Sequence, residues 1–297
     1  MIFDKIAYEH TEPRRIVVIG DIHGDIKRFK NILIDAELIN NDLEWVAQPP
    51  ETIVVQVGDQ IDSANRNPDI PDWEVLDDVN MLYFTNSLDN IAREKGGRVI
   101  SLIGNHELMN TIGNFSYVSK QSLFENRAKF FMPTGTISPI LAKRPIVLKI
   151  GSLFFCHAGV KKAHLDILDK HGKHISHLNE LWSRFMRTGK LVRDDGVIDK
   201  GDIDIFNSVV LDGENGILWT RTIDTDEDAK YVLDKLGCKF VFIGHSPAEG
   251  IKFVNNRLWL TDNGISRAFA TSEYQYIDIL DYHIRIRKII DSDSNSN

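Results

Sequence analysis

The chain has 297 residues, of which 42% are hydrophobic and 26% are charged, and its formal net charge at pH 7 is −8. This composition is typical of a globular protein with a sizeable core and excludes a disordered chain. The negative charge argues against general binding to nucleic acid or to anionic membranes, although a local basic groove is compatible with it.

The two cysteines, Cys156 and Cys238, lie in apolar, strand-like runs. We interpret them as reduced core residues, not as a disulfide. Residues 1–5 lack the basic and then apolar pattern of a signal peptide, and no stretch approaches the roughly 20 apolar residues of a membrane helix. The sequence therefore predicts a cytoplasmic protein with no membrane partner.

The first unit predicted along the chain is a strand, a polar turn and a helix. The apolar run 16–19 is rich in β-branched residues and leads into Gly20-Asp21-Ile22-His23-Gly24-Asp25. Apolar residues with helical spacing follow from Ile26 to Ala36. In extended geometry Asp21 and His23 leave the same face of the chain, which would supply half of a metal site. On this hexapeptide alone, a turn whose aspartate caps the next helix explains the pattern equally well.

Two further strands end in the same way. Residues 52–57 end at Gly58-Asp59-Gln60-Ile61-Asp62, and residues 98–103 end at Gly104-Asn105-His106-Glu107. A loop (63–72) and a helix from Trp73 to about Lys95 separate them. Because ligands of open α/β sheets bind beyond the carboxyl ends of the strands, we expect the three turns to share one site.

The second half of the chain repeats this pattern after an excursion over residues 108–145, in which a helix is predicted around 122–131. A hairpin of strands 146–150 and 153–156 leads to His157, residues 161–235 are mainly helical and charged, and strand 240–243 leads to His245. Further strands are predicted at 251–254, 257–260, 274–280 and 283–290. No linker divides the chain, so one domain is expected over 1–297, with a core at about 14–290 and insertions at 108–145 and 161–235.

Five strand ends thus carry polar side chains, and a single histidine in such a place is more often a core residue. Five glycine-flanked cases together favour a site. The mixture of imidazole, carboxylate and amide groups suits a pair of divalent ions such as manganese, iron or zinc better than calcium or magnesium alone. The residues concerned are Asp21, His23, Asp59, Asp62, Asn105, His106, His157 and His245.

In these residues the chain resembles the calcineurin-like metallophosphoesterases and, within them, the phosphoprotein phosphatase (PPP) family. The family motifs GDxHG, GDxVDRG, GNHE, HAG or HGG, and GH followed by a small residue occur in this order between Gly20 and Pro247. The resemblance implies an α/β fold of two packed mixed β-sheets flanked by helices, in four layers (αββα). It also implies two divalent metal ions, one held by Asp21, His23 and Asp59, the other by Asp59, Asn105, His157 and His245, with Asp59 as the bridging ligand.

Two-metal chemistry generates a hydroxide near neutral pH that attacks phosphorus, while the cations neutralise the phosphate oxygens. The resemblance implies that His106 protonates the leaving oxygen and that Asp62 orients His106. Asp62 could instead be only a turn residue. The metal pair itself, Mn²⁺ or a combination of iron and zinc, is not determined by the ligands.

The chain departs from the family pattern where Ser63-Ala64 replaces the usual Arg-Gly, so a phosphate-binding arginine is missing from its place. Arg66 in the same loop could replace it or could be only a solvated charge. Arg221 and Arg267 resemble phosphate-binding and late-motif arginines of bacterial-type members, and Asn105 would also contact the phosphate. Since no SAPNYC-like loop is present, the resemblance is to a bacterial-type or divergent branch.

The resulting hypothesis is a phosphomonoesterase, in the first place a serine/threonine protein phosphatase acting on phosphorylated protein. The alternative on the same core is a hydrolase of dinucleoside polyphosphates, such as diadenosine tetraphosphate, or of capped nucleotides. Its nucleobase would stack on Trp73, Trp182 or Trp219, although such tryptophans are more often core residues. Weaker alternatives are a catalytically silent scaffold and a cyclic-nucleotide phosphodiesterase or nuclease. We expect the two insertions to determine substrate choice; regulatory subunits are not predicted.

Overall fold

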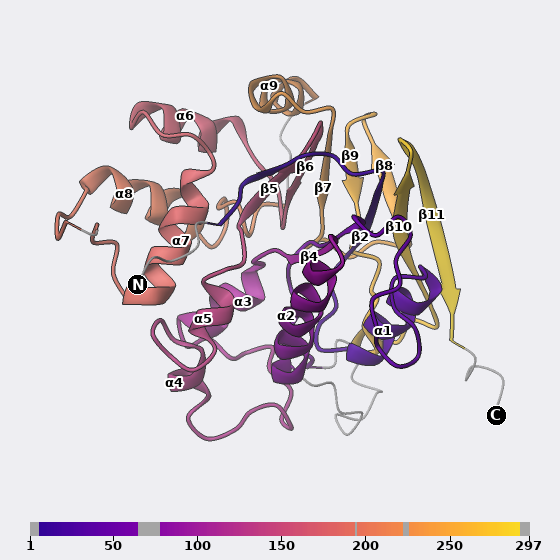
Figure 1. Cartoon of the computed structure of the whole chain (residues 1–297). Helices are drawn as coiled ribbons and strands as arrows, with labels where there is room; N and C mark the ends of the chain where they lie inside the picture. The colour runs from indigo at the N-terminus through magenta and orange to yellow at the C-terminus, as the bar shows by residue number, and fades with distance from the viewer. Residues whose placement is uncertain (1–5, 65–77, 194, 222–225, 292–297) are drawn as a thin grey trace.

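In a computed structural model, two β-sheets pack face to face between two groups of helices (Figure 1). The structure describes residues 6–64, 78–193, 195–221 and 226–291. Among these residues, no helix combines the length and the apolar character that crossing a membrane requires.

The first sheet has five strands in the order β11-β10-β2-β3-β4. Strands β2, β3 and β4 are parallel, and β10 is antiparallel to both of its neighbours. The carboxyl ends of the three parallel strands therefore lie at one edge of the sheet. The strands are β2 (Arg15–Ile19), β3 (Ile53–Gln56), β4 (Arg98–Ser101), β10 (Glu273–Leu280) and β11 (His283–Ile290).

The second sheet has six strands in the order β1-β5-β6-β7-β9-β8. Strands β6, β7 and β9 are parallel. The pair β5/β6 confirms the hairpin predicted from the sequence, and the strands predicted at 251–254 and 257–260 form a second antiparallel pair, β8/β9. The strands are β1 (Glu9–His10), β5 (Val147–Ile150), β6 (Leu153–Cys156), β7 (Phe240–Ile243), β8 (Lys252–Val254) and β9 (Leu258–Leu260).

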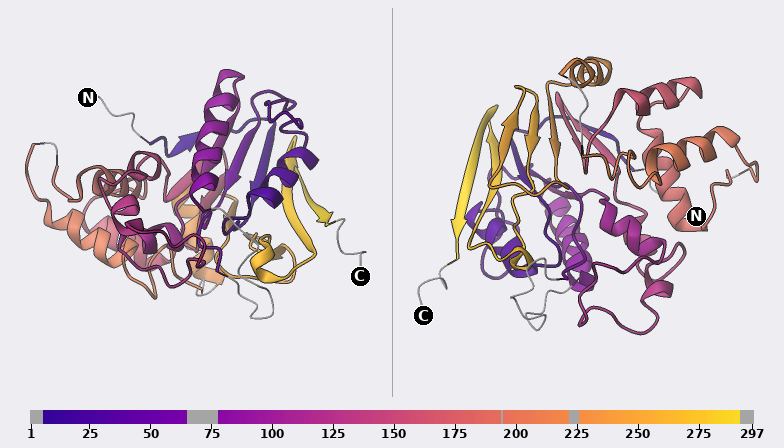
Figure 2. Two further views of the ribbon diagram at one scale, coloured as in Figure 1. Left: turned by 90° about the horizontal axis from the view of Figure 1, so that it is seen from below. Right: turned by 180° about the vertical axis from the view of Figure 1, so that it is seen from behind.

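The helices form the two outer layers, which Figure 2 shows from below and from behind. Helices α1 (Ile26–Asp35) and α2 (Asp78–Glu94) cover the five-stranded sheet. Most of the others cover the six-stranded sheet or connect the layers: α3 (Asn105–Thr111), α4 (Arg127–Phe131), α5 (Ser138–Leu141), α6 (Lys162–Lys170), α7 (His177–Thr188), α8 (Lys200–Ile205), which continues into the π-helical turn η1 (Phe206–Val210), and α9 (Asp226–Leu236). A 3₁₀ turn, η2 (Arg267–Phe269), precedes β10.

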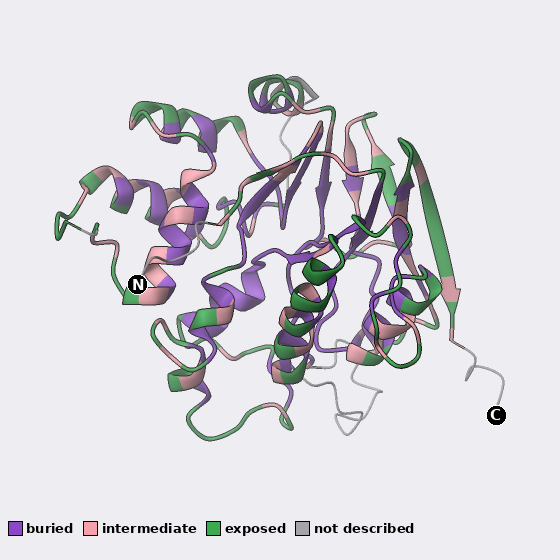
Figure 3. Ribbon diagram, viewed as in Figure 1, coloured by how far each residue is buried: buried purple, intermediate pink, exposed green. Residues whose placement is uncertain are grey.

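The layers follow from the alternation of side chains along each strand. In β2, Val17 and Ile19 pack against the helices, whereas Ile16 and Val18 face the other sheet. In the second sheet, Leu148, Phe155 and Phe242 meet them between the sheets. The central strands β2, β3, β6 and β7 are accordingly buried on both faces, whereas the edge strand β11 is largely exposed, as the colours of Figure 3 show. The predicted α/β fold with four layers, αββα, is confirmed.

Three predictions of local structure need correction or fall outside the description. The helix predicted around 122–131 is only Arg127–Phe131, because Asn126 has a left-handed backbone (φ 67°) and the preceding residues form turns on Ser119. Ahead of the expected core at about 14–290, residues 9–10 form a short strand, β1, which pairs with β5. Trp73, the predicted start of the second helix, lies outside the described residues. The single-domain organisation stays a prediction.

Candidate metal centre

The candidate site lies where the carboxyl ends of the central strands of both sheets meet. Asp21 and His23 follow β2, Asp59 follows β3, and His157 and His245 follow β6 and β7. Asn105 and His106 open helix α3 just beyond β4. All seven side chains are buried. The fold thus gathers residues that are up to 224 positions apart in the sequence, as the hydrogen bond from His245 to Asp21 demonstrates.

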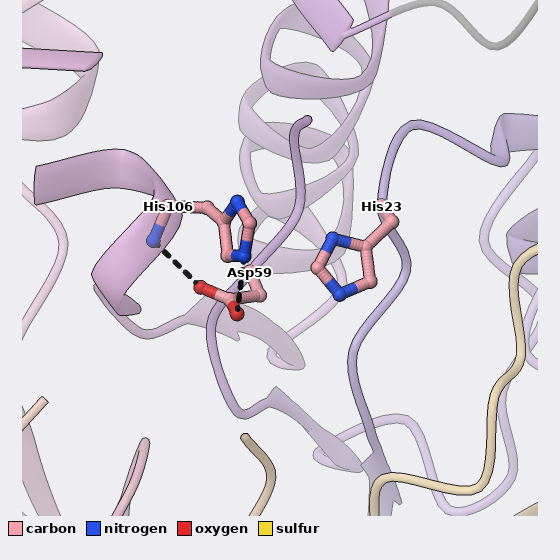
Figure 4. Close-up of side chains that lie close together, drawn as sticks. All are labelled: His23, Asp59 and His106. Carbon is pink, nitrogen blue, oxygen red and sulfur yellow. Dashed lines mark hydrogen bonds and ion pairs between the residues drawn. The ribbon is translucent and has the colours of Figure 1, made fainter. Parts of the chain in front are cut away.

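Asp59 is at the centre of this arrangement. Its Oδ1 accepts a hydrogen bond from the backbone N–H of His106 at 2.9 Å, and its Oδ2 lies 3.2 Å from Nε2 of His157 and 3.7 Å from Nε2 of His106. Figure 4 shows Asp59 between His106 and His23. Potential ligand atoms lie within 4.8 Å of one another in two groups, His23 with Asp59 and His106, and Asp59 with His157 and His245. Asp59 is the residue that both groups share.

Backbone carbonyls fix the orientation of the histidine rings. Nδ1 of His157 lies 2.9 Å from the carbonyl oxygen of Val57, and Nε2 of His245 lies 2.9 Å from that of Trp219. We assign a proton to each of these nitrogens because a carbonyl oxygen can only accept. The other ring nitrogens, Nε2 of His157 and Nδ1 of His245, both lie 2.9 Å from Oδ1 of Asn105. Two imidazoles and an amide oxygen therefore converge beside Asp59, which agrees with the second metal position that the family resemblance implies.

The electrostatics of the centre favour a negative Asp59 among imidazoles. Burial alone would raise the pKa of Asp59, but the charges of His157, His106 and His23 hold it well below its usual value. Burial likewise opposes protonation of His157, yet the Asp59 carboxylate raises the pKa of His157. Burial, together with the charge on His157, lowers the pKa of His245 to about 3. A positive charge is stabilised beside Asp59, which is the condition for holding a cation.

Asp21 has one oxygen that lacks a partner among the described residues. Its Oδ2 accepts from the backbone N–H of His245 at 2.9 Å, but its buried Oδ1 has no hydrogen bond, and neither has Oδ2 of Asp262. Burial and the nearby Asp262 raise the pKa of Asp21, and burial raises the pKa of Asp262 to about 6. Unsatisfied buried carboxylate oxygens are costly, and a cation would satisfy them. The residues present therefore fit divalent metal ions.

Two glycines leave room for the ligating carboxylates. A Cβ on Gly244 would lie 1.9 Å from Oδ1 of Asp21, and a Cβ on Gly104 would lie 2.1 Å from Oδ1 of Asp59. Real Cβ atoms do not approach other atoms so closely, so any side chain at these positions would displace a carboxylate. Glycine is therefore needed at these two motif positions because a side chain would collide with a candidate metal ligand.

The turns that carry the site residues are strained. His23, Asp59, Asp62 and His245 all have positive φ angles, of 42°, 52°, 70° and 68°. Non-glycine residues adopt this region at a cost and concentrate at functional sites. Glu107 stabilises one of the turns, because its carboxylate accepts from the backbone N–H groups of Asp59, Gln60 and Gly104 at 2.7–2.9 Å.

His106 and Asp62 form a pair beside the metal positions. Nδ1 of His106 lies 2.8 Å from Oδ2 of Asp62, and Oδ1 of Asp62 accepts from Nδ2 of Asn110 at 2.7 Å. This leaves Nε2 of His106 directed toward Asp59 and the centre (Figure 4). The imidazole is therefore oriented by a buried carboxylate, which is the arrangement that a general acid needs.

The three arginines predicted to bind phosphate have different surroundings. Nη1 of Arg221 lies 3.1 Å from the carbonyl oxygen of His245, which places this arginine beside a candidate metal ligand. The guanidinium of Arg267 binds both carboxylate oxygens of Asp25 at 2.9 and 3.1 Å. Arg66 lies outside the described residues. Phosphate binding by any of the three stays a prediction.

Sequence reasoning missed several residues that shape the centre. Asp262 follows a sixth strand end, that of β9, and the run of strand ends is the signal that could have pointed to it. Glu107 was seen as part of the GNHE motif but given no role. Asn110, Asp78 and Arg127 carry no local signal, since they reach the site only through the tertiary fold.

The sequence pattern of the calcineurin-like phosphoesterases matches residues 14–249, which include every candidate metal ligand. The chain belongs to the calcineurin-like phosphoesterase family. It is therefore a hydrolase of the metallophosphoesterase type, a family that uses divalent metal ions and acts on phosphoesters or phosphoproteins, and its homologues include PPP-type phosphatases of the bacterial type.

Individual relatives agree with this assignment. The chain is 28% identical over 298 residues to Shewanella-like protein phosphatase 1 of Plasmodium berghei, which covers 93% of this chain and 74% of the relative. It is 36% identical over 114 residues to Shewanella-like protein phosphatase 2 of Arabidopsis thaliana, covering 38% of this chain and 26% of the relative. The crystal structure of a cold-active protein-tyrosine phosphatase from a psychrophilic Shewanella superimposes with a TM-score of 0.73 at 20% identity, covering 96% of this chain and 82% of that one. This structure supports the fold.

Proposed function

We propose that this phosphoesterase is a serine/threonine protein phosphatase of PPP type that hydrolyses phosphomonoesters with the help of two divalent metal ions. The observation that carries the proposal is the position of Asp59, which belongs to both groups of converging ligand atoms. A carboxylate shared in this way is the ligand that a pair of neighbouring cations requires.

The proposed ligands are divided between two positions. One ion would be held by His23 and Asp59, whose ligand atoms converge, together with Asp21, which lies outside that converging group but has a buried Oδ1 without a hydrogen bond. The other would be held by Asp59, Asn105, His157 and His245. Bound there, the pair would activate water for attack on phosphorus and neutralise the charge of the phosphate oxygens. Nitrogen and oxygen donors of this kind suit manganese, iron or zinc.

The protein's own side chains would bind and orient the phosphate and move the proton. Nε2 of His106 would donate its proton to the leaving oxygen as the phosphorus–oxygen bond breaks, and Asp62 would hold the ring in place through Nδ1. Of the two predicted arginines that the structure describes, Arg221 is the better placed to bind phosphate, because its guanidinium lies against the His245 loop. Asn105 would contact both metal and phosphate. Arg267 is less suited, since Asp25 already occupies its planar fork.

The nucleotide alternative finds little support among the described residues. Trp182 is fully buried, and its Nε1 donates to the carbonyl oxygen of Leu141, so it is a core residue and cannot stack a nucleobase. Trp219 packs partly buried against the helical core beside His245, and Trp73 lies outside the described residues.

One observation favours phosphotyrosine as a second candidate substrate. The ring of Tyr117, which is 45% exposed, lies edge-on to the ring of His106 with centroids 5.0 Å apart. An aromatic leaving group could pack beside it. The Shewanella structure that shares this fold is described as a protein-tyrosine phosphatase, which agrees with this candidate.

The experiment that separates these substrates measures phosphate release by the manganese-loaded protein, with Asp59→Asn as the blank. The substrates are a phosphothreonine peptide, the same peptide with phosphotyrosine, and diadenosine tetraphosphate followed by a phosphatase step. Preference for phosphothreonine is the expected result. Preference for phosphotyrosine would indicate that the leaving group packs against an aromatic side chain such as Tyr117. Preference for the dinucleotide would overturn the protein-phosphatase assignment. Activity on none of them would favour a silent scaffold.

A further inference from the structure

Arg127 is a buried arginine in the 108–145 insertion, outside the phosphatase motifs. Arg127 is only 2% exposed to solvent. Its guanidinium carbon lies over the ring of Phe131, 4.5 Å from the ring centre. The rings of Phe124 and Phe115 lie further out, at 5.8 and 6.0 Å. A charged group in such an apolar place needs strong polar partners to offset its loss of hydration.

The partners of Arg127 lead directly to the pair of His106 and Asp62. Its Nη2 lies 3.0 Å from Oδ2 of Asp78 and 3.5 Å from Oδ1 of Asp62. Its Nε donates to Oδ1 of Asn110 at 2.9 Å, and Nδ2 of Asn110 donates in turn to Oδ1 of Asp62 at 2.7 Å. Arg127 therefore interacts with the Asp62 carboxylate in two ways, directly as an ion pair and indirectly through the side-chain amide of Asn110.

Asp78, at the start of α2, binds the backbone of Asp62. Its Oδ1 accepts from the N–H of Asp62 at 3.1 Å, while its Oδ2 binds Arg127. Asp62 has a strained backbone, with a φ of 70°, and its side chain is fully buried. These contacts hold the Asp62 carboxylate in the orientation that faces Nδ1 of His106.

The charges also depend on Arg127. Asp62 and Asp78 are two buried carboxylates close to one another, and Arg127 is a cation that contacts both. Removing its charge would leave two buried acids to repel one another. Asp62 would then turn away from His106 and orient its ring poorly.

We infer that Arg127, acting through Asp78 and Asn110, is a positioning residue for the acid pair His106 and Asp62. The inference rests on the proposed general-acid role of His106. It assigns a catalytic-support function to part of an insertion that sequence reasoning reserved for substrate choice. Protonation of the leaving oxygen should therefore depend on Arg127, whereas metal binding by the strand-end ligands should not.

The test compares leaving groups that do and do not need a proton. Arg127→Met keeps an apolar stem against the phenylalanine rings and removes the charge; Arg127→Lys keeps the charge and loses the planar fork. On phenyl phosphate, whose leaving oxygen needs protonation, we expect kcat of Arg127→Met to fall about 10- to 100-fold, the range for a displaced general acid. On 2,4-dinitrophenyl phosphate we expect a loss of less than about 3-fold. Manganese content should remain that of the wild type.

A double variant and a matched control complete the test. In the His106→Asn background, adding Arg127→Met should cause no further loss on phenyl phosphate, because both changes remove the same function. Arg15→Met removes another largely buried arginine, paired with Asp278 on the far side of the five-stranded sheet, and should lower kcat equally little on both substrates. If Arg127→Met fails to fold, Arg127→Lys and Asp78→Asn are expected to give the same leaving-group dependence.

The possible failures are distinguishable. The inference would be overturned by equal losses on both substrates in the Arg127 and Asp78 variants, or by an additive loss in the double variant. In that case the acid role of His106 would still hold if His106→Asn itself loses more activity on phenyl phosphate than on 2,4-dinitrophenyl phosphate. If His106→Asn also lacks that dependence, the proposed acid role is wrong. Wild-type kcat in Arg127→Met would likewise overturn the inference.

Discussion

Oδ1 of Asp21 occupies the space that a side chain on Gly244 would need, because a Cβ built there would lie 1.9 Å from this oxygen. Asp21 follows a strand of one sheet and Gly244 follows a strand of the other. The two sheets therefore approach each other closely where the candidate metal ligands lie, and the glycine of the fifth motif is needed for the ligand of the first.

Gly244→Ala should accordingly damage the metal centre through contact alone. We expect the variant to lose at least one of two manganese ions and most of its phosphatase activity, because the Asp21 carboxylate must move. Gly213→Ala is the matched control, since a Cβ on Gly213 would meet no atom within 4 Å. Metal content by mass spectrometry and phosphate release check both variants; equal metal content in the two would contradict the expectation.

Arg221→Ala tests the arginine that is expected to replace the missing motif arginine. Its guanidinium contacts the carbonyl oxygen of His245 and the hydroxyl of Ser246. Losing a charge-assisted contact to phosphate should raise KM or lower kcat/KM about 10-fold or more, with metal content unchanged. Arg14→Ala, at an exposed ion pair with Asp281, is the control and should leave kinetics as they are. Unchanged kinetics in Arg221→Ala would direct attention to Arg66 and Arg267.

The raised pKa of Asp78 predicts that the stability of the folded protein depends on pH. Burial raises its pKa from 3.8 to about 7, and Arg127 offsets this only in part. Between these values the folded protein keeps a proton that the unfolded chain has released, so stability should fall as the pH rises through this window. Above about pH 7 the carboxyl is ionised in both states and its contribution becomes constant.

The comparison uses Asp78→Asn, which cannot titrate. In urea denaturation with a chelator present, the free energy of unfolding of the wild type should fall more steeply than that of the variant between about pH 4.5 and 6.5. The difference in slope should approach about 1 kcal/mol per pH unit. Parallel curves for the two proteins would contradict the pKa assigned to Asp78.

The strand ends that carry Asp21, Asp59 and His245 could be predicted from the sequence because each motif is local. An apolar run, a glycine and a polar residue together specify a buried strand followed by a tight turn, and three or more such turns in an α/β fold converge. The four-layer arrangement came from family resemblance. The alternation of Val17, which faces the helices, and Val18, which faces the second sheet, reveals the layers only when the position of the second sheet is known.

What the sequence could not indicate depends on long-range packing. Asp262 lies in Thr261-Asp262-Asn263-Gly264, which is typical of an ordinary turn, and its burial comes from the opposite sheet. Arg127 lies in a charged stretch, typical of a solvated helix, yet three phenylalanine rings and two carboxylates enclose it. The helix predicted around it begins only at Arg127, because Asn126 has a left-handed backbone, and the side chain of Arg127 donates to the carbonyl oxygen of Ser122 in the preceding turn.

The central claim, a pair of metal ions sharing Asp59, is tested most directly by metal stoichiometry. Wild type and Asp59→Asn are reconstituted with manganese, freed of excess metal and analysed by mass spectrometry, with circular dichroism confirming that both are folded. The account predicts two ions per chain for the wild type and less than one for Asp59→Asn, because the bridging carboxylate belongs to both positions. A single ion in the wild type, or two in the folded variant, would contradict it.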